Sequence, residues 1–424
     1  MLKTTNVVQS STRILNFLSV PGAIVKPIYT THYSSHAVQR VPTFRYTYTT
    51  TNFKMPPIPP KGVKVAVLDD YAGTSKTYFE TLEPGFKFEW FSDTLPPYNH
   101  PDTTDDVKKQ IVNRLKPFTI VSSMRERTPF PRELLQQLPG LKLLLTTATR
   151  NLGIDMVAAK ELGITVTGTT NKRPPNAQAI TPTKRKGPDS TTQHTVALIL
   201  GIAKNLARDN DAVKRGEWQL GLSTGLTGKT LGLLGLGRLG IAVGKIMYSA
   251  FGMKIIAWSS NLTQETADEK ATNAGLPIED EDGDKTFRLV SKEELFKNAD
   301  VLSVHYVLSD RSRGIVGAED LKLMKRSALF INTSRGPLVD EDALLQCLSN
   351  GAIKGAALDV FALEPLPLDS KWRTTNWGQD GTSQVLLTPH TGYVEEETLN
   401  NWYYEQSEIL RSWRDGKGVE PVIN

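Results

Sequence analysis

The chain has 424 residues, of which 39% are hydrophobic and 22% charged, and it has a single cysteine, Cys347. One cysteine excludes an intramolecular disulfide and a metal site of clustered cysteines, and no apolar run approaches the roughly 20 residues that span a bilayer. The net charge of +5 arises in residues 1–54, which hold six Lys or Arg and no acidic residue. The remaining 44 basic and 45 acidic residues nearly balance, so this charge does not favour a nucleic-acid or membrane surface.

Residues 1–55 stand apart by composition. They are acid-free, contain Lys and Arg, and are rich in Ser and Thr, which is typical of organellar transit peptides. Pro21 and Pro27 interrupt an amphipathic helix early, so the alternative is an unstructured extension, or a gene model whose true start is Met55. The sequence leaves a mitochondrial and a cytoplasmic location open, and we exclude this segment from the fold.

Alternating strand and helix patterns predict a first α/β domain after a stiff polyproline linker at residues 56–60. The length favours two or three domains, and the alternation predicts a parallel sheet. The predicted elements of this domain are strands at residues 63–68, 118–122, 141–145 and 164–167 and helices at 105–115 and 132–138.

Residues 171–190 interrupt this alternation with a polar, basic and proline-rich stretch. We interpret it as a flexible surface loop rather than a nuclear localisation signal. Within it, residues 172–190 look like an insertion, which is either a retained piece of the gene model or a segment that covers the cleft. A long apolar helix at residues 192–206 is expected to lead into a second domain.

A glycine-rich stretch at residues 235–240 predicts a dinucleotide site in the second domain. It lies between two apolar runs and opens a helical pattern, which is the strand–turn–helix–strand order that the fingerprint requires. In such a turn Gly235 permits the tight bend, Gly237 lets backbone approach a pyrophosphate, and Gly240 lets helix and strand pack closely. The helix N-terminus then offers N–H groups to the phosphates. The alternative is an ordinary glycine-rich turn.

The rest of the second domain repeats strand and helix. A helix at residues 341–349 has Asp340 as its candidate N-cap and Gly351 just beyond its end, and an acidic loop at 278–284 is expected to be solvated. The predicted strands are residues 230–234, 254–258, 301–305, 328–333, 356–360 and 385–388. These patterns predict an α/β protein with two doubly wound parallel-sheet domains, the second a Rossmann dinucleotide-binding domain, and a cleft between them.

Three polar residues follow late strands of the second domain, namely Arg335, Glu364 and His390. Ligands of open α/β sheets bind outside the carboxyl ends of the strands, so we expect the three side chains to converge. An arginine clamps a carboxylate with a rigid fork of donors, and a histidine exchanges a proton with a hydroxyl or carbonyl oxygen. A glutamate on the other ring nitrogen fixes the tautomer and favours the imidazolium. Together they predict hydride transfer between a nicotinamide and a 2-hydroxy or 2-keto acid.

Each of these residue types also has a structural interpretation when it occurs alone. Such an arginine often forms a surface ion pair, a glutamate before proline a solvated turn, and a histidine after proline a cap; their occurrence after three successive strands favours catalysis. We interpret His305 as a structural residue at a strand end rather than a second base, and Cys347 as a small core residue. His32, His36 and His100, in the extension or a proline-rich loop, form no ligand spacing, and no metal site is predicted.

Four motifs resemble those of the D-isomer-specific 2-hydroxyacid dehydrogenase family, which includes phosphoglycerate dehydrogenase and glyoxylate/hydroxypyruvate reductase. The motifs are GLGRLG at 235–240, NTSRGP at 332–337, ALDVFALEP at 357–365 and TPHTG at 388–392. The resemblance covers roughly residues 61–424, with the motifs in the family's order. It implies two similar α/β domains, the first completed by the C-terminal helix, and a homodimer formed through the cofactor domain. The implied boundaries are 61–191 plus 397–424 for the substrate domain and 192–396 for the NAD(P)-binding domain.

The resemblance also implies a role for each catalytic candidate. Arg335 would be the substrate clamp, Glu364 the partner of the histidine, and His390 the acid/base, while the loop at residues 122–126 would line the substrate side. Formate dehydrogenases of this fold carry Gln in place of the Glu, so that activity is disfavoured.

The predicted cofactor-binding residues are Gly235, Gly237, Arg238, Leu239, Gly240, Ser259, Ser260, Thr333 and Asp359. Among them, the resemblance implies that Arg238 and Leu239 offer backbone to the pyrophosphate and that Asp359 contacts the nicotinamide amide. The acidic residue expected about 20 residues after the glycines is missing, because the second strand ends in the neutral Ser259 and Ser260. Its loss removes repulsion against a 2′-phosphate, yet no Arg stands nearby to bind one, so NAD is favoured and NADP is the alternative.

These features predict an NAD(P)-dependent D-2-hydroxyacid dehydrogenase, an oxidoreductase that acts on a small 2-hydroxy or 2-keto acid and has no nucleic-acid or membrane partner. The alternative is a dinucleotide-sensing co-repressor or scaffold of the same fold with little turnover. The motifs do not identify the acid, because first-domain loops near Met124 and Thr147 decide it and one methylene is worth only about 1–3 kcal/mol.

Overall fold

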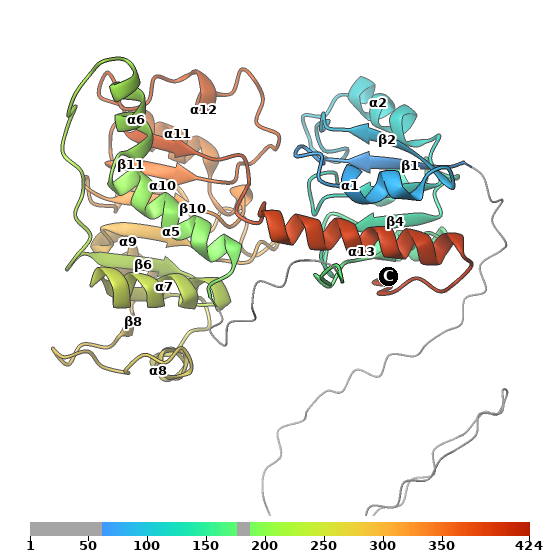
Figure 1. The fold of residues 1–424 in the computed structure, drawn as a ribbon. Helices are drawn as coiled ribbons and strands as arrows, with labels where there is room; N and C mark the ends of the chain where they lie inside the picture. Colours follow the sequence, from blue (N-terminus) through green and yellow to red (C-terminus); the bar gives the residue numbers. More distant parts are fainter. Residues whose placement is uncertain (1–61, 176–186) are drawn as a thin grey trace, which may run out of the picture. The chain divides into compact units, whose positions relative to one another are not determined.

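The computed structural model describes residues 62–175 and 187–424. The predicted extension at residues 1–55 and residues 176–186 of the predicted insertion lie outside the described residues. Within the described part, the strands form two parallel sheets, one of five strands and one of seven (Figure 1). The prediction of two parallel-sheet α/β domains is therefore confirmed.

The first sheet has the strand order β2-β1-β3-β4-β5, and its neighbouring strands are parallel. Its strands are β1 (Val63–Leu68), β2 (Phe86–Phe91), β3 (Ile120–Ser123), β4 (Leu143–Thr146) and β5 (Thr165–Thr167). The connections hold α1 (Lys76–Phe79), the 3₁₀ helix η1 (Glu80–Leu82), α2 (Asp105–Leu115), α3 (Arg132–Leu135) and α4 (Met156–Glu161). Because β1 and β3 are parallel neighbours, the loops that follow them leave the same edge of the sheet.

Two features of this sheet differ from the prediction. The edge strand β2 was missed because its sequence, FKFEWF, mixes charged and aromatic residues and is only partly buried. The helix predicted at 132–138 ends at Leu135, because Pro139 disfavours helical backbone at the residue before it. The chain instead closes with tight turns, in which Leu138 N donates to Leu135 O.

The second sheet has the order β12-β11-β10-β9-β6-β7-β8, also with parallel neighbours. Its strands are β6 (Thr230–Leu234), β7 (Lys254–Trp258), β8 (Phe287–Leu289), β9 (Val301–Val304), β10 (Leu329–Asn332), β11 (Gly355–Leu358) and β12 (Gln384–Leu387). The helices are α5 (Ser190–Ala203), α6 (Leu206–Lys214), α7 (Arg238–Phe251), α8 (Gln264–Asn273), α9 (Lys292–Asn298), α10 (Ala318–Lys322), the 3₁₀ helix η2 (Gly336–Leu338), α11 (Glu341–Ser349) and α12 (Lys371–Thr374). The strand order reverses between β6 and β9, which makes this the switch point where ligands of such sheets bind.

The helix predicted at residues 192–206 is two helices. Asp189 begins α5 by accepting a hydrogen bond from Thr192 N over 2.9 Å. Asn205 has a left-handed backbone, with φ of 55°, which asparagine tolerates better than most residues, and α6 begins after it. Apolar periodicity does not reveal this break, because α5 is apolar up to Ala203 and the exposed Leu206 continues the apolar pattern.

The last helix, α13 (Glu396–Arg414), lies against the first sheet (Figure 1, red). Leu399 and Trp402 share a buried cluster with Val65 of β1 and Leu143 of β4. This packing is what the resemblance implies for the C-terminal helix. The domain boundaries themselves stay a prediction.

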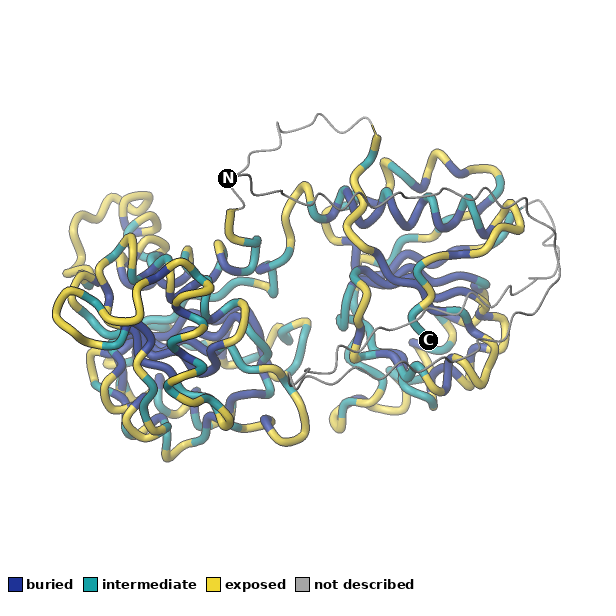
Figure 2. Tube along the Cα trace, turned by 90° about the horizontal axis from the view of Figure 1, so that it is seen from below, coloured by how far each residue is buried: buried dark blue, intermediate teal, exposed yellow. Residues whose placement is uncertain are grey.

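The strands of both sheets form the buried interior (Figure 2, dark blue). Fully buried apolar runs such as β4 and β10 are typical of parallel strands covered by helices on both faces. Among residues 62–175 and 187–424, no helix is long and apolar enough to cross a membrane. No group of three or more His, Cys, Asp or Glu in the same residues could hold a metal ion.

The N-cap of α11, the cysteine within that helix and the acidic loop before β8 were each predicted from the sequence. Asp340 begins α11 by accepting a hydrogen bond from Ala343 N over 3.0 Å, as predicted. Cys347 packs against the core, and burial raises the pKa of its thiol, which agrees with a structural role. The acidic loop is exposed, but Asp284 within it pairs with Lys254 over 2.9 Å.

His305 follows β9 beside the glycine turn. The backbone N–H of His305 donates to Leu234 O over 2.8 Å, and the ring Nε2 lies 2.9 Å from Ser303 Oγ. Burial lowers the pKa of the imidazole from 6.5 to about 4. These contacts support the structural interpretation of this histidine.

The lowered pKa of His305 predicts a pH-dependent contribution to stability. Below about pH 6.5 the unfolded chain protonates His305, whereas the folded chain does so only near pH 4, so stability is lost as the pH falls between these values. A His305→Gln variant lacks this loss, so the Tm of wild type minus the Tm of the variant should decrease as the pH falls from about 7 toward about 4.5, whichever protein is more stable at neutral pH. Thermal unfolding followed by circular dichroism measures both Tm values, and a difference that stays constant would contradict a neutral His305 imidazole.

Candidate active site

The turn after β6 leaves room for a phosphate at the start of α7. Gly235 has φ of 106°, and a Cβ there would lie 2.8 Å from His305 O. A Cβ at Gly240 would lie 2.3 Å from Gly235 O, so both positions require glycine. Gly237 is the N-cap of α7, and a Cβ there would meet nothing within 4 Å. The open helix N-terminus therefore fits the pyrophosphate of a dinucleotide.

Arg238 and Leu239 form the first turn of α7. Arg238 is exposed and its guanidinium pairs with Asp189 at the start of α5, while Leu239 is half-buried. Backbone N–H groups in a first helical turn lack partners within the helix. The structure thus puts both residues where the prediction needs them, and their contact with a pyrophosphate stays a prediction.

Tyr306 lies against the end of β7, where the sequence lacks the usual acidic residue. Its hydroxyl accepts a hydrogen bond from Ser260 N over 3.0 Å and donates to Ser260 Oγ over 2.9 Å. Its ring stacks on Trp258 with the ring centres 6.0 Å apart, and Ser259 Oγ lies 3.4 Å from the hydroxyl. Sequence reasoning missed Tyr306, because it follows β9 and reaches β7 only across the sheet.

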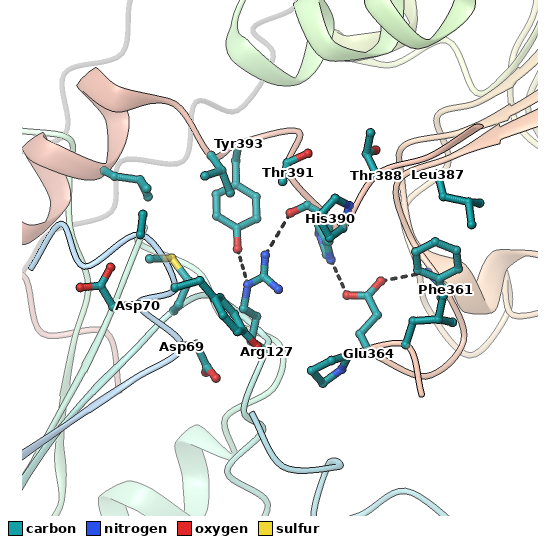
Figure 3. Close-up of a pocket in the computed structure, with 18 of the residues that line it drawn as sticks. Asp69, Asp70, Arg127, Phe361, Glu364, Leu387, Thr388, His390, Thr391 and Tyr393 are labelled. Atoms are coloured by element: carbon teal, nitrogen blue, oxygen red, sulfur yellow. Dashed lines mark hydrogen bonds and ion pairs between the residues drawn. The ribbon is translucent and has the colours of Figure 1, made fainter. Parts of the chain in front are cut away.

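His390 and Glu364 come together as predicted. Nδ1 of His390 lies 2.5 Å from Oε2 of Glu364, and Oε1 of Glu364 accepts a hydrogen bond from Phe361 N over 2.9 Å (Figure 3). The side chains are only 18% and 23% exposed. With the carboxylate as acceptor for Nδ1–H, the ring is oriented and Nε2 is the nitrogen left to meet a substrate oxygen.

Asp359, at the end of β11, anchors the loop that carries His390. Its Oδ1 accepts hydrogen bonds from Thr388 Oγ1 over 2.6 Å and Thr391 N over 2.8 Å, and its Oδ2 accepts one from Gly392 N over 2.9 Å. His194 of α5 adds a contact of 3.1 Å through Nε2. Burial opposes ionisation of this carboxyl, but the bonds from His194, Thr388 and Thr391 lower its pKa.

The carboxylate of Asp359 is only 1% exposed and is engaged by the loop. Its predicted contact with the nicotinamide amide stays a prediction. The role of His194 was missed, because a histidine in an apolar helix gives no sign of its partner. Thr333, another predicted cofactor residue, is buried. Its hydroxyl oxygen lies 2.7 Å from that of Thr195 in α5.

Arg335 follows β10 as predicted, but it makes its contacts away from the His390–Glu364 pair. Its Nη2 lies 3.4 Å from Glu126 Oε2, and its Nη1 donates to Ser334 O over 2.8 Å. Among residues 62–175 and 187–424, no hydrogen bond or ion pair joins Arg335 to His390 or Glu364. The structure therefore brings two of the three catalytic candidates into contact and places the third beside the loop after β3.

Arg127, in the same loop, contacts the backbone of His390 (Figure 3). Its Nη2 donates to His390 O over 3.0 Å, and its Nε donates to Tyr393 Oη over 2.8 Å. Its guanidinium lies 5.4 Å from the ring centre of Tyr71 and 5.7 Å from that of Tyr393. His390 has a left-handed backbone, with φ of 53°, so this bond holds a strained residue. The sequence prediction for the loop stopped one residue short of Arg127.

Comparison with known proteins shows what this arrangement resembles. The family described as D-isomer specific 2-hydroxyacid dehydrogenase, NAD binding domain, matches residues 196–392. Glyoxylate reductase of Aeropyrum pernix is 34% identical over 301 residues, which cover 69% of this chain and 79% of the relative. D-3-phosphoglycerate dehydrogenase of Methanocaldococcus jannaschii is 32% identical over 319 residues, which cover 75% of this chain. The match spans only 54% of that longer relative.

The fold comparison agrees. A phosphoglycerate oxidoreductase from Vibrio cholerae O395 has a TM-score of 0.66 and 30% identity, and the match covers 83% of this chain and 99% of that one. These relatives are named as reductases, dehydrogenases or oxidoreductases, so the alternative interpretation as a co-repressor has no support. The predicted NAD-binding domain is confirmed. This chain therefore belongs to the D-isomer specific 2-hydroxyacid dehydrogenase family of NAD-dependent oxidoreductases.

Proposed function

We propose that the protein interconverts a small 2-keto acid and the matching D-2-hydroxy acid, with His390 as acid/base, Glu364 as its partner and Arg335 as the carboxylate clamp. The observation that carries this proposal is the 2.5 Å contact between His390 Nδ1 and Glu364 Oε2. Such a contact makes one ring nitrogen structural and leaves the other for chemistry. A relative named glyoxylate reductase adds support for this substrate class.

Proton transfer is the part of the reaction that His390 would perform. In the reducing direction, Nε2–H of the imidazolium gives its proton to the C2 oxygen of the keto acid, and in the oxidising direction neutral Nε2 takes it back. Glu364 accepts Nδ1–H in both directions and stabilises the imidazolium by its negative charge. A nicotinamide, when bound, supplies or accepts the hydride.

Arg335 would bind the substrate carboxylate. A guanidinium has five N–H donors, and two hydrogen-bonding contacts engage it here, with Ser334 and Glu126. The contact with Glu126 spans 3.4 Å, so an incoming carboxylate competes with a long ion pair rather than a close bidentate one. A bidentate bond to the substrate is stronger than this contact.

The cofactor site favours NAD over NADP in this proposal. Gly235, Gly237 and Gly240 leave the helix N-terminus open to a pyrophosphate, and Ser259 and Ser260 are neutral where a ribose would lie. The Tyr306 hydroxyl is already hydrogen-bonded to the backbone N–H and the hydroxyl of Ser260. Within the described residues no Lys or Arg is hydrogen-bonded to Ser259 or Ser260, whose partner is the Tyr306 hydroxyl, and this supports NAD over NADP.

A homodimer and the location complete the proposal. Trp218, Leu220 and Leu222, between α6 and β6, are 76%, 46% and 91% exposed. Large exposed apolar side chains this close together mark an interaction surface, which supports the implied dimer through the cofactor domain.

The acid-free composition of residues 1–55 supports a mitochondrial location, with the cytoplasm as the alternative.

Replacing His390 tests the acid/base assignment. A His390→Ala variant should lose about 10²–10⁴ of kcat in the reduction of a 2-keto acid by NADH, because no side chain delivers the proton. NADH binding, followed by fluorescence titration, should stay near that of the wild type. Turnover close to that of the wild type would exclude His390 as the acid/base.

Replacing Arg335 tests the clamp separately. An Arg335→Ala variant should raise KM for the keto acid by at least about 10-fold, because a charge-assisted bond to the carboxylate is lost. The matched control is Arg313→Ala, an exposed arginine outside the site, which should keep the wild-type KM and kcat. An Arg335→Ala enzyme with both constants unchanged would contradict the clamp.

A further inference from the structure

A cavity of about 580 Å³ adjoins the His390–Glu364 pair (Figure 3). One side is formed by the loops after β1 and β3, with Tyr71, Met124 and Arg127, and the other by residues after β11 and β12. Its apolar wall includes Met124, Phe361, Leu366, Leu387, Val394 and Leu399. Pockets of this size hold whole cofactors or drug-sized ligands.

The volume is far larger than a two- or three-carbon keto acid needs. One water occupies about 30 Å³ in the liquid, and glyoxylate or pyruvate displaces only a few waters. The cavity is lined by neither the glycine turn nor the first turn of α7, so the nucleotide end of the cofactor does not account for it. Even with a nicotinamide ring beside the substrate C2 atom, a small acid would leave part of the apolar wall in contact with water.

The charged groups in the wall are turned to protein partners. Asp69 is bonded by Thr94 and Thr128, and burial, which outweighs these bonds, raises its pKa. Asp70 accepts hydrogen bonds from Thr74 N and Ser75 N. These carboxyl groups therefore stabilise the loops by accepting hydrogen bonds from them. A cationic substrate group would have to break buried hydrogen bonds to reach either carboxyl group.

The arginines in the wall are engaged in the same way. Arg373 donates to Leu366 O through Nε and Nη2, and Arg127 donates to His390 O and to Tyr393 Oη. Burial raises the pKa of Tyr393, so its ring is neutral and offers an aromatic face rather than a charge. Arg127 and Arg373 each spend two donors on protein acceptors, so a phosphate or second carboxylate on the substrate would meet only the N–H groups that remain.

We infer that the preferred substrate is a 2-keto acid with a large apolar or aromatic group beyond C3, and that this group lies in the cavity. The inference rests on the proposed function and names its substrate class. His390 and Glu364 form part of the wall, whereas Arg335 lies outside it. A keto acid held by Arg335 at its carboxylate and by His390 at its C2 oxygen therefore directs its side chain into the apolar space. Tyr71 and Tyr393, whose rings already pack against the Arg127 guanidinium, add aromatic surface to the cavity wall.

The direct experiment measures kcat/KM of the full chain with NADH for phenylpyruvate, 4-methyl-2-oxopentanoate, pyruvate and glyoxylate. We expect phenylpyruvate or 4-methyl-2-oxopentanoate to exceed pyruvate and glyoxylate by at least about 10-fold, because each buried methylene contributes roughly a factor of 10 or more. A preference for pyruvate or glyoxylate would overturn the inference and leave the proposed function standing. Absence of turnover with all four acids would overturn the proposed function itself.

A cavity-filling variant locates the side chain. Val394→Trp, at an exposed position of the wall, should lower the ratio of kcat/KM for phenylpyruvate to that for pyruvate by at least about 10-fold. Ala72→Trp adds the same bulk to the cavity from the loop after β1 and should lower the same ratio of kcat/KM values. Because the two substitutions lie in different loops, a folding defect in one variant leaves the other to test the inference. Val157→Trp, an exposed valine of α4 that does not line the cavity, is the control and should keep the wild-type ratio. An unchanged ratio in both wall variants would overturn the inference.

Discussion

The buried carboxylate of Asp359 joins the second sheet to the loop that carries His390. It accepts hydrogen bonds from Thr391 N, Gly392 N and Thr388 Oγ1, so three residues of that loop are tied to the end of β11. Leaving such backbone donors unpaired in a buried site costs about 1–3 kcal/mol each. The position of His390 therefore depends on an anion that does not itself line the cavity beside it.

Two further contacts complete the orientation of His390. Glu364 holds its ring at Nδ1, and Arg127 holds its carbonyl oxygen from the loop after β3. The first contact engages Nδ1 and leaves Nε2 without a partner on Glu364, and the second joins the histidine to a loop of the other sheet. Because His390 has a left-handed backbone, which costs free energy in a residue with a side chain, these bonds keep it in one arrangement.

The sequence was informative where local chemistry decides the structure and silent where distant contacts do. Strand ends, the glycine turn and the pairing of Glu364 with His390 follow from residue types at the carboxyl ends of parallel strands. The edge strand β2 escaped prediction because partial burial weakens its apolar pattern. The contacts of Arg127, His194 and Tyr306 join segments far apart in the chain, and no short-range pattern encodes them. The cavity is likewise a property of two loops and two strand ends brought together by folding.

The pairing of His390 with Glu364 can be tested by measuring kcat/KM across pH in wild type and a Glu364→Gln variant, from NADH consumption with the best 2-keto acid. If His390 donates the proton as an imidazolium paired with an anionic partner, the variant loses about 10²–10⁴ of kcat/KM at neutral pH. Its alkaline fall in rate also moves to lower pH, because an amide does not stabilise the imidazolium as a carboxylate does. A variant with the wild-type rate and the wild-type pH profile would contradict this role of the pair.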